Sequence, residues 1–267
     1  MDRRTLNQMA SNGQSTIAQE DRVNVNESGK SLARVFGYLS LGLLVTAAVA
    51  FGLSLLFVST IGMVGEEMEG PIFTTYLVLL LVSFVANIIV SFALSFSLRK
   101  AFTGSPSNKL KVLYLVYAGL MGVMCSSLLV AGIDFWVIGE AFGITAISFG
   151  VMFLVGYFSK ANLNVIGAVA SAFIMTILLS LMVFSLVSLI TGVSFYSLAL
   201  DITVSLILSV FILILVAVNS YNMKHLIEAG AMSRSMELYF AVDMYCDFMI
   251  VFIRVLRVLI LVAAKKD

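Results

Sequence analysis

The side chains best suited to chemistry lie in the last apolar stretch of the chain, residues 236–264. Two acids and two bases recur along it: Asp243, Asp247, Arg254 and Arg257. At 100° per residue in a helix, these four fall within an arc of about 80°, together with Tyr239. Ionisable groups inside a membrane cost at least about 2.5–3.5 kcal/mol each and usually face protein or a water path. The stripe therefore predicts a helix at the centre of a bundle.

The two carboxylates of this stripe, Asp243 and Asp247, are one helical turn apart, about 6 Å along the axis. Like charges that close in a poorly solvated place titrate as a pair, which favours an ion path or gate that responds to protons. Carboxylates are also ligands for Ca²⁺, although two alone form only a weak, transient site, and no other cofactor is indicated. The alternative is a set of static salt bridges to Arg99, Lys224 or Arg254 that only holds the bundle together.

Other polar residues near apolar stretches are weaker candidates. Glu140 lies near the start of a span, with Asp134 at its mouth, and is a second candidate for the ion path. His225 follows the sixth apolar stretch, where an interfacial histidine is the simpler interpretation. Cys125 and Cys246 fall inside apolar stretches, where a thiol packs as a small hydrophobic group.

The elements that must position these residues are membrane-spanning helices. Hydrophobic residues make up 61% of the 267 residues and charged residues 12%, against about 45–50% and about a quarter in soluble domains. Apolar stretches of about 20 residues, the length that crosses a bilayer, recur along the chain. We predict seven helices: Val35–Val64, Ile72–Leu98, Val112–Ile133, Phe135–Phe158, Val165–Thr191, Ile202–Met223 and Met236–Ala264. A tight turn at Gly132–Asp134 separates the third from the fourth, and the glycines that recur in the helices are expected to allow close helix contacts.

The basic residues predict the orientation of the bundle. Of the 16 Lys and Arg residues, 12 lie in the N-terminal segment or in the second, fourth and sixth connections, and positively charged connections stay on the cytoplasmic side. We therefore interpret residues 1–34 as a disordered cytoplasmic tail and residues 35–267 as the transmembrane domain. Seven crossings place Lys265 and Lys266 outside, against the rule, which a last helix that re-enters without crossing would avoid.

Composition also argues against several functional classes. With a net charge of +1, the chain has no basic surface for nucleic acid. One histidine and no His and Cys cluster argue against the usual zinc enzymes. No serine has a paired histidine within a span for acyl transfer. We expect the chain not to be an enzyme.

Three segments resemble the Bax inhibitor-1 family. The most specific is the last helix, in which Tyr245, Asp247, Phe248, Phe252, Leu256 and Arg257 keep the family register within AVDMYCDFMIVFIRVLRVL, residues 241–259. The other two are FGYLSLGLLVTAAVAFG from Phe36 and EAFGITAISF from Glu140. The resemblance implies an all-α membrane protein in which six helices surround a central C-terminal seventh.

The same resemblance implies a pH-sensitive calcium leak channel. In that family an aspartate ending the sixth helix and one in the seventh form a proton-sensing pair that engages an arginine of the second helix. Asp247 matches the seventh-helix aspartate, and Arg99 matches the arginine. The sixth-helix position departs from the family, because Tyr221 is followed here by Asn222 instead of aspartate. Our hypothesis is that Asp243 and Asp247 rebuild the pair within one helix, with Asn222 as a neutral partner and Arg254, Arg257, Tyr245 and His225 in supporting positions.

The competing function is a non-conducting regulator. Some bacterial relatives of this type bind a membrane-bound ATP-dependent protease, and the polar N-terminal segment would suit such a partner. The short connections and the lack of a targeting segment favour a bacterial plasma membrane over an organelle. Expected partners are therefore the lipid bilayer, calcium ions and another membrane protein.

Overall fold

The structure is a computed structural model that describes residues 29–57, 71–101, 108–130, 132–191 and 198–263. In these ranges the chain forms seven helices and no strand. The N-terminal helix is Gly29–Phe57. The others are α2 (Pro71–Ala101), α3 (Asn108–Val130), α4 (Phe135–Phe158), α5 (Asn164–Thr191), α6 (Leu198–Glu228) and α7 (Arg234–Ala263). The predicted all-α, seven-helix architecture is therefore confirmed.

The helix ends differ from the prediction mainly in polar flanks. The described N-terminal helix includes residues 29–34, which are therefore helical instead of part of a disordered tail, while residues 1–28 lie outside the described residues. At its far end α6 continues past Met223 to Glu228. Apolar content marks only the part of a helix that hydrocarbon surrounds, whereas backbone hydrogen bonding continues into the polar residues beyond it.

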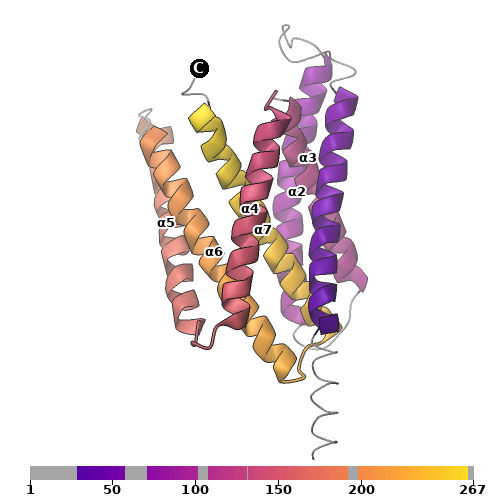
Figure 1. Cartoon of the computed structure of the whole chain (residues 1–267). Helices are drawn as coiled ribbons and strands as arrows, with labels where there is room; N and C mark the ends of the chain where they lie inside the picture. Colours follow the sequence, from indigo (N-terminus) through magenta and orange to yellow (C-terminus); the bar gives the residue numbers. More distant parts are fainter. Residues whose placement is uncertain (1–28, 58–70, 102–107, 131, 192–197, 264–267) are drawn as a thin grey trace, which may run out of the picture.

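Successive helices run in alternating directions, so Ala263 lies at the opposite end of the bundle from Gly29 (Figure 1). The last helix, α7, is 30 residues long, about 45 Å at 1.5 Å per residue. It runs through the bundle without turning back (Figure 1). The described part of α7 is therefore one continuous helix, and its crossing of the membrane stays a prediction.

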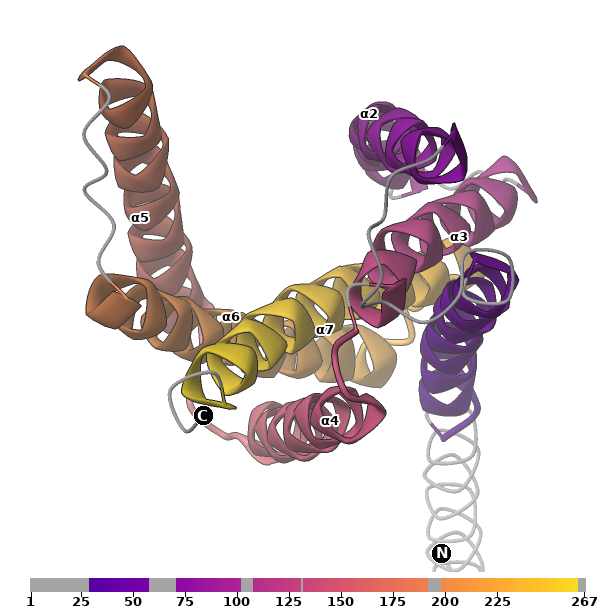
Figure 2. The same cartoon turned by 90° about the horizontal axis from the view of Figure 1, so that it is seen from above.

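Six of the described helices are long and apolar enough to cross a membrane, and α7 is not among them. The exception is the helix that carries the charged stripe. Seen along the bundle, α6 and α7 cross its middle, with α4 on one side and α2 and α3 toward the other (Figure 2). The N-terminal helix lies beside α3 and also contacts α4, where the Phe36 and Phe153 rings are 4.8 Å apart. The outermost helix, α5, packs chiefly against α6.

Side chains of α7 form much of the buried core. The most buried include Ala241, Met244 and Tyr245, each 0% exposed, and Leu256, 1% exposed. They pack against buried residues of the N-terminal helix, α3, α4 and α6 within one hydrophobic cluster. The prediction that the charged C-terminal helix is central is confirmed.

Some of the recurring glycines allow the close contacts that were predicted, and others do not. A Cβ at Gly156 of α4 would overlap the backbone of Ala217 on α6, and one at Gly42 would overlap the Tyr114 hydroxyl. At Gly139 and Gly150 of α4, by contrast, a Cβ would meet no atom within 4 Å. Only glycines such as Gly42 and Gly156, where a side chain would overlap a neighbouring helix, set the distance between helices.

Two glycines in the left-handed region end helices and make sharp turns. Gly132 has φ 77° and Gly230 has φ 64°, a conformation that glycine adopts without steric cost. Asp134 then caps α4 by accepting a hydrogen bond from the Trp136 amide at 3.1 Å. The predicted tight turn between the third and fourth helices is confirmed, and Gly230 makes α6 and α7 an antiparallel hairpin.

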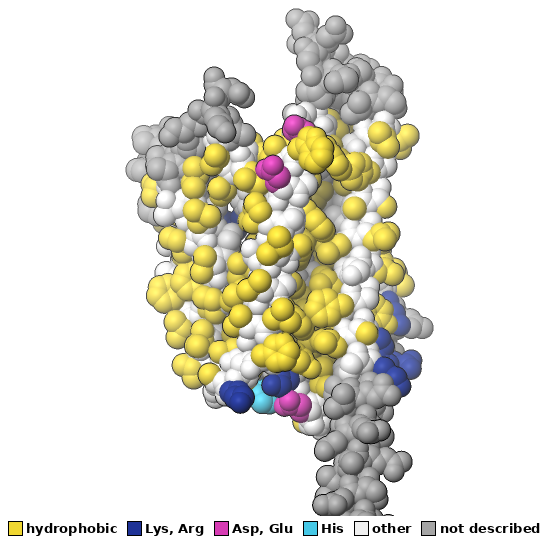
Figure 3. Space-filling view, viewed as in Figure 1, with side chains coloured by type: hydrophobic (Ala, Val, Ile, Leu, Met, Phe, Trp, Pro, Cys, Tyr) yellow, Lys and Arg dark blue, Asp and Glu magenta, His cyan; other side chains and the backbone are white. Residues whose placement is uncertain are grey.

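On the face shown in Figure 3, the surface of the bundle is apolar along its length, and charge gathers toward its ends. Large side chains such as Leu44, Ile147 and Phe158 are each 68–70% exposed. Exposed apolar surface on this scale fits contact with lipid. The chain is a multi-pass integral membrane protein.

Candidate functional site

The α6–α7 hairpin sets which polar residues meet at the centre of the bundle. The first helix of the hairpin ends at Glu228 and the second begins at Arg234. Asn219 is nine residues before Glu228, and Asp243 is nine residues after Arg234. In an antiparallel pair of helices with equal rise, these two residues lie at the same level.

Asn219 and the two aspartates form a polar cluster at this level. The Asn219 side-chain amide donates a hydrogen bond from Nδ2 to Oδ2 of Asp243 at 2.7 Å. A longer contact of 3.5 Å joins the same Nδ2 to Oδ2 of Asp247. Each of the three side chains is only partly buried. A single neutral amide therefore bridges the two carboxylates predicted as a pair.

The ion pairs seen among the described residues join Arg34 to Glu237, and Lys224 and His225 to Glu228. Lys224, one of the three predicted salt-bridge partners, contacts Glu228 instead at 3.8 Å and lies 5.8 Å from the centre of the Tyr157 ring. The side chain of Arg99 lies outside the described residues, so its predicted contact stays a prediction. In the described part of the chain, the observed hydrogen-bond donor to both aspartates is thus the side-chain amide of Asn219.

The neutral partner of the pair is one helical turn away from the residue that was predicted. Asn222 makes no hydrogen bond to Asp243 or Asp247 among the described contacts, and by the hairpin register it lies level with Phe240. The resemblance to the family matches Asn222 with the sixth-helix aspartate by its position in the sequence, after Tyr221. Which amide reaches the carboxylates depends instead on the length of the turn between α6 and α7.

The supporting residues of the predicted stripe are spread more widely than expected. Arg254 is partly buried and Arg257 is exposed. Glu140 is exposed on α4, away from the cluster. His225 lies at the end of α6, where Nδ1 is 3.6 Å from Oε2 of Glu228 and the ring packs edge-on against Tyr221. The interfacial interpretation of His225 fits this position.

Tyr245 lies on the other side of α7 and has a structural role. It is fully buried, and its hydroxyl is 2.6 Å from Oγ1 of Thr46 on the N-terminal helix. Thr46 also contacts the carbonyl oxygens of Gly42 and Ala118, each at 3.0 Å. The Tyr114 ring packs edge-on against the Tyr245 ring at 5.5 Å. These contacts join α7 to the N-terminal helix and α3, and so fix its rotation.

A second buried acid, Glu237, was not singled out from the sequence. Its side chain is 2% exposed, and Oε1 is 2.9 Å from Nη2 of Arg34 on the N-terminal helix. The other oxygen, Oε2, is buried and has no hydrogen-bond partner. This ion pair connects the N-terminal helix near its described start to the first turn of α7 at one end of the bundle.

The sequence contains a signal for each of the two residues that were missed. Asn219 is an amide inside the apolar sixth stretch, and an amide there needs a polar partner. Glu237 is six residues before Asp243 in the same helix, but it stands at the helix start, where solvent exposure is the usual expectation. Both signals become informative only when the helix ends are known.

The described residues contain no cluster of three or more His, Cys, Asp or Glu side chains that could hold a metal ion. Ca²⁺ takes six to eight oxygen ligands, and the cluster offers two carboxylates and, if its amide turned, one amide oxygen. The arrangement suits brief contact with a passing cation better than a resident ion.

Fold and site together define a class of protein: a multi-pass helical membrane protein whose charged C-terminal helix is enclosed by other helices. The profile of the family described as "Inhibitor of apoptosis-promoting Bax1" matches residues 29–263. The match begins and ends with the described bundle, and the chain belongs to this Bax inhibitor-1 family. An uncharacterised protein of Borreliella burgdorferi is 27% identical over 244 residues, 90% of this chain and 95% of that protein.

Proposed function

We propose that this protein is a pH-sensitive leak pathway for calcium, or for cations more generally, with Asp243, Asp247 and Asn219 as its central element. The observation that carries the proposal is the amide bridge of 2.7 and 3.5 Å between Asn219 and the two carboxylates. A pair held by a neutral amide keeps its negative charge for an entering cation.

The chemistry of the amide gives the cluster two arrangements. Ionised carboxylates only accept hydrogen bonds, so Asn219 must turn its NH₂ group toward them when no cation is present. A half-turn of the amide offers its oxygen instead, which gives an entering Ca²⁺ a third ligand. Protonation removes the charge that attracts the cation. Calcium flux is therefore expected to fall as the pH is lowered.

The orientation and location belong to the same proposal. Basic residues concentrate at the end of the bundle where Gly29 lies (Figure 3), and positively charged connections remain in the cytoplasm. We place that end in the cytoplasm of a bacterium and the bundle in its plasma membrane. Ala263 then lies on the outer side.

Calcium flux in proteoliposomes at two pH values tests the proposal. Asp243→Asn and Asp247→Asn should each reduce the flux and remove most of its pH dependence. Glu140→Gln is the matched control, because it neutralises an exposed acid outside the cluster and should leave both properties unchanged. If Asp243→Asn keeps the full pH dependence of the unmodified protein, the pair is not the proton-sensing element.

The second candidate function is a non-conducting regulator that binds another membrane protein, such as a membrane-bound ATP-dependent protease. The Arg34–Glu237 ion pair favours it, because this contact connects the helix that follows residues 1–28 to the central helix. Deletion of residues 1–28 separates the two functions. A channel keeps its flux after the deletion, whereas a regulator that acts through this segment loses its partner.

A further inference from the structure

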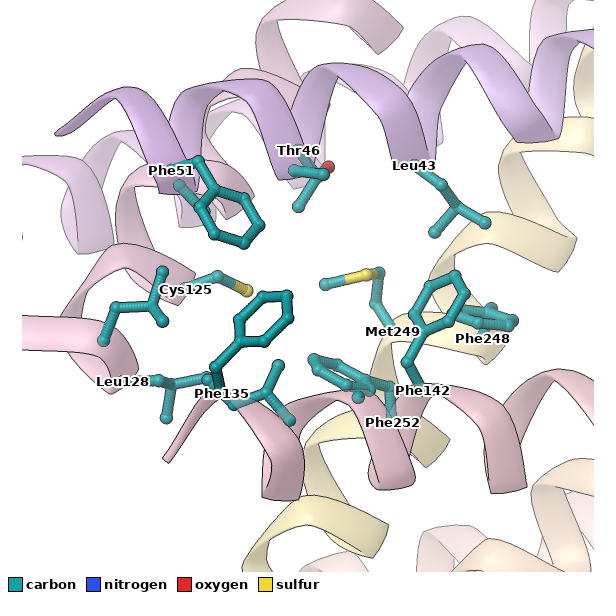
Figure 4. Close-up of a pocket in the computed structure, with 15 residues that line it drawn as sticks. Leu43, Thr46, Phe51, Cys125, Leu128, Phe135, Phe142, Phe248, Met249 and Phe252 are labelled. Carbon is teal, nitrogen blue, oxygen red and sulfur yellow. The ribbon is translucent and has the colours of Figure 1, made fainter. Parts of the chain in front are cut away.

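A cavity of about 310 Å³ lies between the N-terminal helix, α3, α4 and α7. Phe51, Phe135 and Phe142 project into it with Met249 and Phe252 (Figure 4). Its volume is at the lower end of the roughly 300–1,000 Å³ typical of small-molecule sites. It extends along the N-terminal helix from Leu43 to Phe51, about 12 Å at 1.5 Å per residue.

The lining offers almost nothing to a polar ligand. Its only hydroxyl is Thr46, whose oxygen already contacts two backbone carbonyls and the Tyr245 hydroxyl. Cys125 contributes a thiol, and the remaining lining residues are apolar or glycine. Water or an ion in this space would leave hydrogen bonds unmade, which argues for an apolar occupant.

The cavity is separate from the proposed ion pathway. On α7 it is lined by Phe248, Met249 and Phe252, which lie at least about 100° around the helix from both Asp243 and Asp247. The carboxylates face the α6 side, where Asn219 reaches them. The body of α7 thus stands between the two features.

The cavity reaches the outer surface between the N-terminal helix and α4. Its inner wall is buried, with Ala50 and Phe252 each 7% exposed. Its rim is exposed: Phe51 by 42%, Phe142 by 45% and Phe135 by 56%. In a multi-pass membrane protein, this rim faces bilayer hydrocarbon. Phe135, the first residue of α4, places it in the half of the bundle away from Gly29 (Figure 1).

We propose that this cavity binds one acyl chain of a phospholipid from the leaflet away from Gly29. The chain enters between the N-terminal helix and α4 and lies against Phe252 and Met249, while the headgroup stays outside, because the lining has no polar group for it. Three observations identify this occupant: the lack of free polar atoms, the elongated shape, and the opening toward hydrocarbon. The site does not depend on the proposed calcium leak.

Photolabelling in vesicles tests the proposal. The protein is reconstituted with phosphatidylcholine that carries a diazirine on one acyl chain, irradiated, digested and mapped by mass spectrometry. Adducts should concentrate on peptides that contain the cavity lining around Cys125, Phe135–Phe142 and Phe248–Phe252. Labelling of these peptides should be unchanged in Asp243→Asn, which separates this site from the ion pathway.

Matched variants test whether the lipid adducts come from the cavity. Gly139→Leu fills the cavity from α4, where an added Cβ would meet no atom within 4 Å, and should remove most of the cavity adducts. Gly150→Leu is the control on the same helix, also in open space but outside the cavity, and should keep them. Ala47→Phe fills the cavity from the N-terminal helix and should act like Gly139→Leu.

Three outcomes would overturn the proposal. Adducts could spread evenly over all lipid-facing helices and ignore Gly139→Leu, which means ordinary contact with surrounding lipid. Joining of two copies of the chain at the rim by a bifunctional cross-linker, with loss of the lipid adducts there, would make a second copy the occupant. Labelling by diazirine-bearing free palmitate but not by the phospholipid would mean that a free fatty acid, and not a lipid of the bilayer, fills the space.

Discussion

Nη2 of Arg34 lies 2.9 Å from Oε1 of Glu237, an acid whose side chain is 2% exposed. This contact joins the described start of the N-terminal helix to the first turn of α7. The two residues are 203 positions apart in a chain of 267, so the pair closes the bundle between its first and last helices.

Removing Arg34 should destabilise the protein more than removing the pair as a whole. Arg34→Ala leaves a buried carboxylate without this partner, at a cost of about 2–4 kcal/mol once the partial exposure of Arg34 is allowed for. Glu237→Gln in the same chain removes the uncompensated charge and should restore much of the loss. Thermal unfolding in detergent measures both. If the double variant is no more stable than Arg34→Ala, the contact does not contribute in this way.

Removing one partner of the hydrogen bond between Tyr245 and Thr46 should cost less stability than removing the other. Tyr245→Phe removes a hydroxyl and leaves Thr46 with its two carbonyl contacts, so the cost should be about 1 kcal/mol. Thr46→Val leaves the buried Tyr245 hydroxyl without this partner and should cost about 1–3 kcal/mol. The order of the two melting temperatures checks the prediction. A larger loss for Tyr245→Phe would contradict it.

The contact between α4 and α6 depends on Gly156. Gly156→Ala places a methyl group against the backbone of Ala217, which forces the helices apart and should cost about 1–3 kcal/mol. Gly150→Ala on the same helix meets open space and should be neutral or stabilising by up to about 1 kcal/mol. Melting temperatures of the two variants provide the comparison. Equal losses of stability in the two variants would mean that the contact with Ala217 does not set the cost.

The sequence predicts the seven helices and the central position of the last one, for a clear physical reason. Charged residues on one face of an apolar helix have few tolerable places in a membrane, so their spacing alone places α7 inside the bundle. The bounds of α4 match the prediction, because Asp134 caps its start and Ser159 and Lys160 mark where its apolar stretch ends. Where an apolar stretch continues into a polar helix, as at Gly29 and Glu228, the same reasoning ends the helix too early.

The partners within the site were harder to predict than the aspartates themselves. Which amide meets Asp243 depends on the length of the turn between Glu228 and Arg234, and an error of one turn in a helix end exchanges Asn219 for Asn222. The Arg34–Glu237 contact was missed because residues 29–34 were interpreted as a disordered tail. In both cases the missing information is three-dimensional register, which the composition of a single helix does not contain.

The difference between Asn219 and Asn222 leads to the sharpest prediction about the site. Asn219→Asp adds a third carboxylate beside Asp243, and since the number of charged ligands tunes calcium affinity, the calcium concentration for half-maximal flux should fall by about tenfold, equivalent to about 1.4 kcal/mol. Asn222→Asp restores the acid expected from the family pattern but lies level with Phe240, and should leave this concentration unchanged. Calcium titrations of flux in proteoliposomes distinguish the two variants. A strong effect of Asn222→Asp together with none for Asn219→Asp would mean that the family register operates in the membrane and that the observed amide bridge does not.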